Sequence, residues 1–152
     1  MSCGVALAVS LLLSDPNIAM AAALPPPAAD APVSVAGEPL FSDIIARSGA
    51  LKGVVRGWIE AGTVDQAGFA GFRAQAVELA ALDMQGHLIL KERGTDGDLK
   101  CILRGISEDI PVKIAAVEAA TTPAERRVAL EELHYLLNDN VEVITAPPQP
   151  PV

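Results

Sequence analysis

A carboxylate and an imidazole stand one helical turn apart near the middle of this 152-residue chain. Asp83 and His87 are four positions apart, a spacing that puts two side chains on the same side of an α-helix. Apolar residues recur at helical spacing along the same line, at Phe69, Phe72, Ala76, Leu79 and Leu90. The pattern predicts that this face turns toward a core, where a carboxylate and an imidazole need polar partners.

Two more polar residues extend this set. Ser48 interrupts the first apolar pattern of the chain, and His134 lies at the edge of the last one. If successive helices alternate in direction, Ser48, Asp83, His87 and His134 are expected in one polar layer. His87, Asp83 and His134 offer donors that zinc, copper or nickel accept, so a divalent transition metal site is one interpretation. The other is a buried Asp–His pair that is satisfied internally and sets the helix register.

The cysteine at position 101 is a second candidate contact. It falls opposite the apolar stripe of its predicted helix, so we expect it to be exposed. The only other cysteine, Cys3, lies in a segment expected to be removed, which leaves Cys101 without an intramolecular partner. An intermolecular disulfide or a contact with a partner protein is therefore one hypothesis, and an inert free thiol is the other.

The two ends of the chain differ in composition from its middle. An apolar run at residues 5–13, followed by a small-x-small motif, predicts a cleaved signal peptide at 1–23, although no Lys or Arg precedes Arg47. The run is too short to span a bilayer. Residues 24–39 form a Pro/Ala-rich linker and residues 145–152 a Pro-rich tail, and both are expected to be disordered. The predicted location is periplasmic or secreted, with no stable membrane insertion after cleavage.

The middle of the chain, residues 40–144, reads as one helical domain. Hydrophobic residues make up 51% of the sequence but aromatic residues only 3%, which favours alanine-rich helices packed closely. Four helical patterns occur, at about 40–61, 63–93, 98–120 and 122–143. The short connections between them predict an up-down-up-down four-helix bundle, an all-α fold.

Several residues mark where these helices begin, end or bend. Thr63 and Gln66 form one capping-box pattern, and Thr122 and Glu125 form another. Pro111 lies in the middle of the third pattern, where we expect a kink or a break. Three glycines of the first pattern recur every four residues and are expected to line a seam between helices, at Gly49, Gly53 and Gly57.

No arrangement of residues in the sequence predicts catalysis, so no catalytic or cofactor-binding residue is assigned. The net charge of −8 disfavours binding to nucleic acid or to anionic lipid. We interpret the chain as an exported, soluble binding bundle with an interaction or structural role, whose partner is another protein or a second copy. Two alternatives remain: a metal-binding bundle, and a carrier with an apolar cavity for a small ligand. No cofactor is predicted except in the first alternative.

Overall fold

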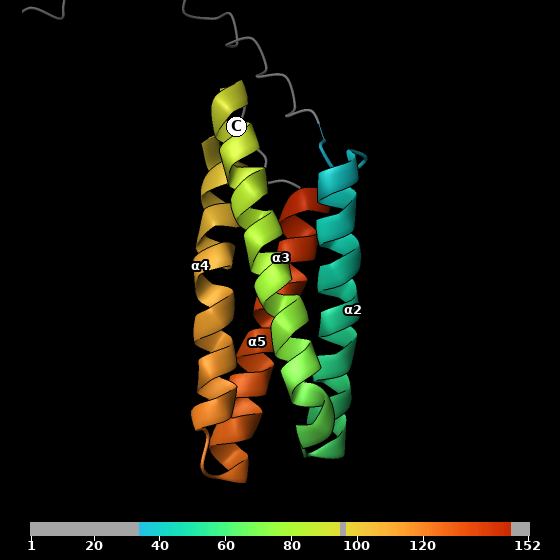
Figure 1. The fold of residues 1–152 in the computed structure, drawn as a ribbon, viewed down its shortest axis with the longest axis vertical. Helices are drawn as coiled ribbons and strands as arrows, with labels where there is room; N and C mark the ends of the chain where they lie inside the picture. The colour runs from blue at the N-terminus through green and yellow to red at the C-terminus, as the bar shows by residue number, and fades with distance from the viewer. Residues whose placement is uncertain (1–33, 95–96, 147–152) are drawn as a thin grey trace, which may run out of the picture. The chain divides into compact units, whose positions relative to one another are not determined.

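A computed structural model of the chain describes residues 34–94 and 97–146, and these form an all-α four-helix bundle (Figure 1). The helices are α2 (Pro39–Ala61), α3 (Gln66–Arg93), α4 (Gly97–Ala119) and α5 (Pro123–Thr145). The predicted fold is confirmed, and each predicted boundary lies within three residues of the observed one. The predicted signal peptide and most of the predicted linker and tail lie outside the described residues. None of the described helices has both the length and the apolar character needed to cross a bilayer.

The helix ends follow from local capping. Thr122 and Glu125 form the predicted capping box, because each side chain accepts a hydrogen bond from the other residue's backbone N–H. The predicted cap at Thr63 is wrong: α3 begins three residues later, after Asp65, whose carboxylate accepts a hydrogen bond from the N–H of Ala67 at 3.0 Å. A carboxylate at the start of a helix also interacts favourably with the helix dipole, which favours Asp65 as the cap.

Two glycines terminate helices in the left-handed conformation. Gly62 has φ of 67° at the end of α2, and Gly94 has φ of 65° at the end of α3. A residue with a side chain rarely adopts this conformation, so the glycines allow the chain to leave each helix sharply. A short connection then leads into the next helix, which packs against the preceding one, so consecutive helices run antiparallel.

The helices occupy the four corners of the bundle. Each helix contacts its neighbours in sequence, and α5 closes the ring against α2, so that α3 and α5 lie at opposite corners (Figure 1). Ion pairs at the surface bridge several of the seams: Arg47–Glu78 between α2 and α3, Arg73–Glu118 between α3 and α4, and Lys113–Glu132 between α4 and α5. Such pairs each contribute little to stability, so the bundle is held mainly by its apolar core.

The core is built from the apolar stripes predicted for each helix. The heptad spacing of α2 predicts a stripe that is buried throughout: Phe41, Ile44, Ser48, Leu51, Val55 and Trp58. The stripe predicted for α4 is half-buried at Ile102 and buried at its other members: Leu99, Leu103, Ile106, Ile110, Ile114 and Val117. The stripe predicted for α5, Leu130, Leu133, Leu137 and Val141, is wrong at its last member, because Asn140 is buried and Val141 is only half-buried.

The structure corrects two expectations about backbone geometry. Of the kink or break expected at Pro111, the break does not occur, because α4 continues through the proline from Gly97 to Ala119, and the kink stays a prediction. The proline is exposed, so water can reach the carbonyl that its ring leaves without a donor. The α2 glycines do not line a close seam either: Gly53 and Gly57 are exposed, and a Cβ atom at either would meet nothing within 4 Å.

Candidate functional site

A polar layer crosses the core between α2, α3 and α5. The three side chains are Ser48, Asp83 and Asn140, and each has no exposed surface. The amide of Asn140 donates one hydrogen bond to the hydroxyl oxygen of Ser48 and one to Oδ2 of Asp83, both at 3.0 Å. Asn140 therefore joins α5 to both α2 and α3, and its bond to Asp83 spans the diagonal of the bundle between α5 and α3.

Two oxygen atoms of this layer lack a hydrogen-bond donor. Oδ1 of Asp83 and Oδ1 of Asn140 are buried and have no partner among the described residues. Burial raises the pKa of Asp83 from 3.8 to about 7, and the hydrogen bond from Asn140 opposes that shift only in part. The neutral acid suits this environment, because a protonated carboxyl carries an O–H donor where two acceptors would otherwise be unmatched.

His87 belongs to a separate contact one turn along α3. Its Nδ1 lies 2.7 Å from the backbone carbonyl oxygen of Lys100 on α4. A carbonyl oxygen can only accept, so Nδ1 carries the proton and donates it in this bond. The half-buried imidazole thus ties α3 to the first turns of α4, and only Nε2 is left for another partner.

His134 is not brought to this layer. It is half-buried in α5, six residues before Asn140, which is about 9 Å along a helix axis. His87 lies about 6 Å beyond the layer in the other direction, so the two imidazoles are roughly 15 Å apart along the bundle. Within residues 34–94 and 97–146, no three His, Cys, Asp or Glu side chains form a group that could hold a metal ion. The predicted metal set of His87, Asp83 and His134 is therefore not gathered at one point.

The sequence reasoning placed Ser48 and Asp83 correctly but missed Asn140. The signal was present: Leu133, Leu137, Asn140 and Ile144 follow the alternating three- and four-residue spacing of a buried helix face. Choosing the apolar Val141 instead gave preference to residue type over spacing.

Cys101 is a free and exposed thiol, as predicted. The hypothesis that it forms an intermolecular disulfide stays a prediction.

A second feature lies on the outside of α3 and was also missed. Seven residues recur with spacings of three and four and carry no charge: Ala67, Ala70, Ala74, Val77, Ala81, Met84 and Leu88. We call this set the outer seam. Six of the seven are exposed, including Val77 and Leu88 with 54% of their surface each, and Met84 is half-buried. This spacing is the heptad repeat by which one α-helix packs along another.

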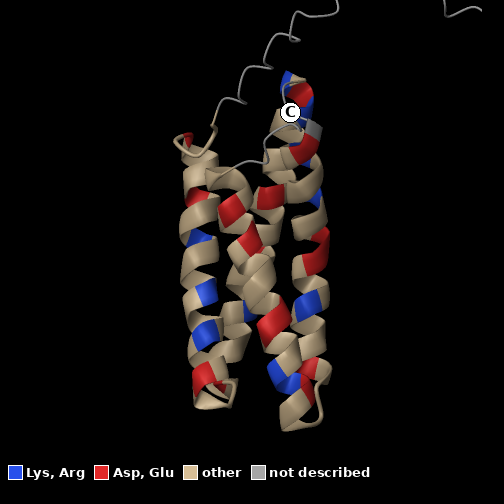
Figure 2. Cartoon of the chain, turned by 180° about the vertical axis from the view of Figure 1, so that it is seen from behind, with Lys and Arg blue, Asp and Glu red and all other residues tan. Residues whose placement is uncertain are grey.

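The outer seam makes α3 apolar on two opposite sides. The inward side contributes Phe72, Leu79 and Leu90 to the core, while the outer seam points away from it. Seen from the side opposite α3, Lys, Arg, Asp and Glu are spread along the helices in view (Figure 2).

A surface groove lies elsewhere, between the end of α4 and the start of α5. It has a volume of about 680 Å³ and is lined mainly by alanines, with Val128, Glu125 and Glu132. This groove opens on the outside of the bundle, whereas the expected ligand cavity would lie between the core faces of the helices.

Comparison of the chain with known protein families, with curated proteins and with solved structures gives no match.

Proposed function

We propose that this chain is an exported helical-bundle protein that acts by binding an α-helix of a protein along the outer seam of α3. The observation that carries the proposal is the apolar heptad from Ala67 to Leu88 on a solvent-facing side of the longest described helix. A continuous uncharged strip of this kind is unusual on a free surface and typical of helix-to-helix contacts.

The composition of the outer seam supports a helix as the bound element. Four of its seven residues are alanines, which let a second helix approach closely, and Val77, Met84 and Leu88 supply larger apolar side chains. An extended peptide would need unpaired backbone groups to bond with, and the backbone groups in the middle of a helix are already paired. The bundle therefore presents side chains alone, which is how helices recognise one another.

Cysteine labelling in cells tests the proposal without knowledge of the partner. In a chain with Cys3 and Cys101 replaced by serine, Val77→Cys introduces a thiol on the outer seam, and Val54→Cys introduces one at an exposed residue of α2 as the control. A membrane-permeable maleimide should label the Val77→Cys protein several-fold more slowly in the cells that make it than in dilute purified solution. The Val54→Cys protein should label equally fast in both settings. Equal labelling of the Val77→Cys protein in both would overturn the proposal.

The export part of the proposal rests on the apolar run near the N-terminus. The intact mass of the protein recovered from its natural source tests it. The expected mass lacks about the first 21–23 residues, and a mass that includes residues 5–13 would contradict export by cleavage.

A further inference from the structure

We infer that the helix bound by the outer seam is α3 of a second copy of this chain, packed parallel and in register. The inference rests on the proposed function and adds the identity and direction of the partner. It comes from the residues that flank the outer seam, because flanking charges set which helices pair and in which direction.

The two flanks of the outer seam carry different charges. With Ala67, Ala74, Ala81 and Leu88 taken as heptad position a, the charged residue at position g is Arg73, beside Gln66, Ala80 and His87. The charged residues at position e are Glu78 and Glu92, beside Gly71 and Gln85. The g flank faces the α4 side, where Arg73 reaches Glu118 at 3.1 Å. The e flank faces the α2 side, where Glu78 reaches Arg47 at 3.2 Å.

A parallel pair of α3 helices brings unlike flanks together. In a parallel two-stranded coiled coil, position g lies beside position e of the partner's next heptad, five residues further on. Arg73 would then lie beside Glu78 of the partner subunit, and His87 beside Glu92 of the partner subunit. Each contact occurs twice because of the two-fold symmetry.

An antiparallel pair is disfavoured by the same residues. It would place the e flank of one copy against the e flank of the other, and Glu78 and Glu92 would gather in one row. Like charges facing each other destabilise a helix pair, so the distribution of charge selects the parallel arrangement.

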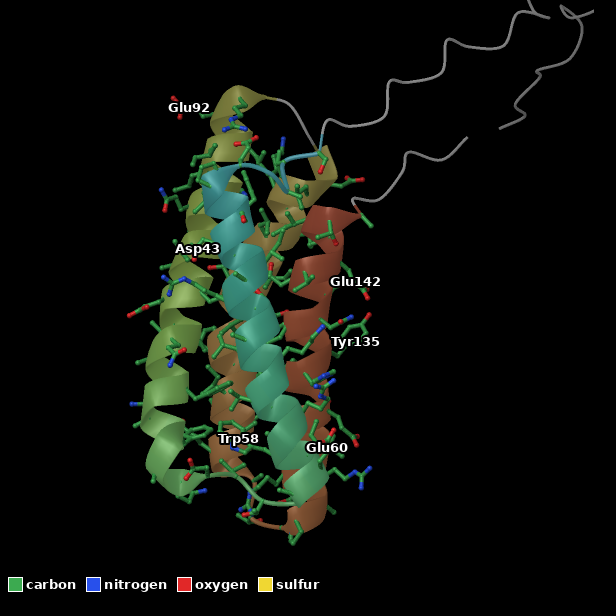
Figure 3. The ribbon with its side chains drawn as sticks, turned by 90° about the vertical axis from the view of Figure 1, so that its right-hand side faces the viewer. Asp43, Trp58, Glu60, Glu92, Tyr135 and Glu142 are labelled. Carbon is green, nitrogen blue, oxygen red and sulfur yellow. The ribbon has the colours of Figure 1, made fainter. Side chains whose placement is uncertain are left out.

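The flanking residues are free to make these contacts. Arg73 and Glu78 are each more than half exposed, so their present ion pairs are weak and can be exchanged or shared. Glu92 points away from the bundle near the end of α3 (Figure 3). His87 donates from Nδ1 to the carbonyl oxygen of Lys100, so it can pair with Glu92 of the partner subunit only when Nε2 also carries a proton.

Sedimentation of the full-length protein is the first arm of the test. In reducing buffer, a monomer–dimer equilibrium is expected over roughly 1 µM to 1 mM. Arg73→Glu and Glu78→Arg should each weaken the dimer at least several-fold, and the double exchange should restore it. Circular dichroism of each variant shows whether the monomer is folded. If the double exchange leaves the dimer as weak as either single variant does, the proposed register is overturned.

Disulfide trapping is the second arm and reports direction. With Cys3 and Cys101 replaced by serine, Ala81→Cys should form a cross-linked dimer on mild oxidation, because the two copies of position 81 face each other only in a parallel pair. Ala50→Cys, at an exposed alanine of α2, is the matched control and should not cross-link. A monomer at every concentration, with equal cross-linking at both positions, would overturn the second-copy inference. Slow labelling of the Val77→Cys protein in cells would then still show that another protein covers the outer seam.

Discussion

The inward and outward sides of α3 are both apolar, yet the described residues cover only one of them. Leu79 on the inward side has no exposed surface, while Val77, two positions earlier, has 54%. The inward side also holds a buried carboxylate, Asp83, and the outer seam carries no charge between Ala67 and Leu88. Apolar spacing alone therefore does not show which face of α3 the rest of the bundle covers.

The largest expected difference between the two sides is a dependence of stability on pH. Asp83 has a pKa of about 7 in the folded chain and an ordinary value of 3.8, which is near that of the unfolded chain. A raised pKa stabilises the folded chain in full below pH 3.8, and this stabilisation declines as pH rises and is lost once pH passes about 7. The unfolding free energy lost is about 4 kcal/mol, because the two pKa values differ by about three and each pKa unit corresponds to about 1.36 kcal/mol.

Urea denaturation of the wild type and of Asp83→Asn between about pH 4 and pH 8 checks this dependence. Asparagine resembles the protonated acid and cannot ionise, so the difference in unfolding free energy between the two proteins isolates Asp83. The wild type should lose stability relative to Asp83→Asn as pH rises. Parallel curves for the two proteins would mean that Asp83 is already ionised in the folded bundle.

Truncating one leucine on each side of α3 gives the next largest contrast. Leu79→Ala removes a fully buried side chain and should lower the unfolding free energy by about 3 kcal/mol. Leu88→Ala removes a side chain that is 54% exposed and should cost less than about 0.5 kcal/mol in the monomer. Denaturation at low protein concentration measures both, and equal costs would show that the outer seam is covered within one chain.

The sequence predicted the helices well because each inward stripe repeats one simple spacing. The buried residues of α2 were all named in advance, and the capping box of α5 was placed correctly. The polar layer was predicted only in part. Asn140 was missed because a buried amide breaks the apolar pattern, and His134 was misplaced because an antiparallel arrangement sets direction but not the height of each residue.

The outer seam shows a different limit of the same reasoning. Phe72, Leu79 and Leu90 identify the inward side of α3, but they carry no information about the spacing of apolar residues on the opposite side. Periodicity at residues 67–88 was readable from the sequence, but only the structure shows that no other helix of the described bundle covers it.

Two glycines of α3 give a smaller contrast between the sides. A Cβ atom at Gly71 would meet nothing within 4 Å, so Gly71→Ala should stabilise the monomer by about 1 kcal/mol through helix propensity. A Cβ atom at Gly86 would lie 3.2 Å from Leu103 Cδ1 and 3.2 Å from Phe41 Cε1. Crowding there should cancel the gain, leaving Gly86→Ala less stable than Gly71→Ala by about 1 kcal/mol or more. Thermal unfolding of the two variants measures the difference, and equal melting temperatures would mean that the core yields freely at Gly86.

The smallest effect on the monomer is expected where the effect on association is greatest. Val77→Glu places a charge in the middle of the outer seam, where water solvates it as long as the chain is alone, so the unfolding free energy should change by less than about 0.5 kcal/mol. In an assembled pair the same carboxylate would be desolvated opposite its own copy, and assembly should be lost. Sedimentation together with denaturation separates the two effects. If the Val77→Glu variant is destabilised but still assembles, Val77 belongs to the fold of one chain and the contact between chains lies elsewhere. If the variant is instead a stable monomer, the outer face of α3 serves association and not folding.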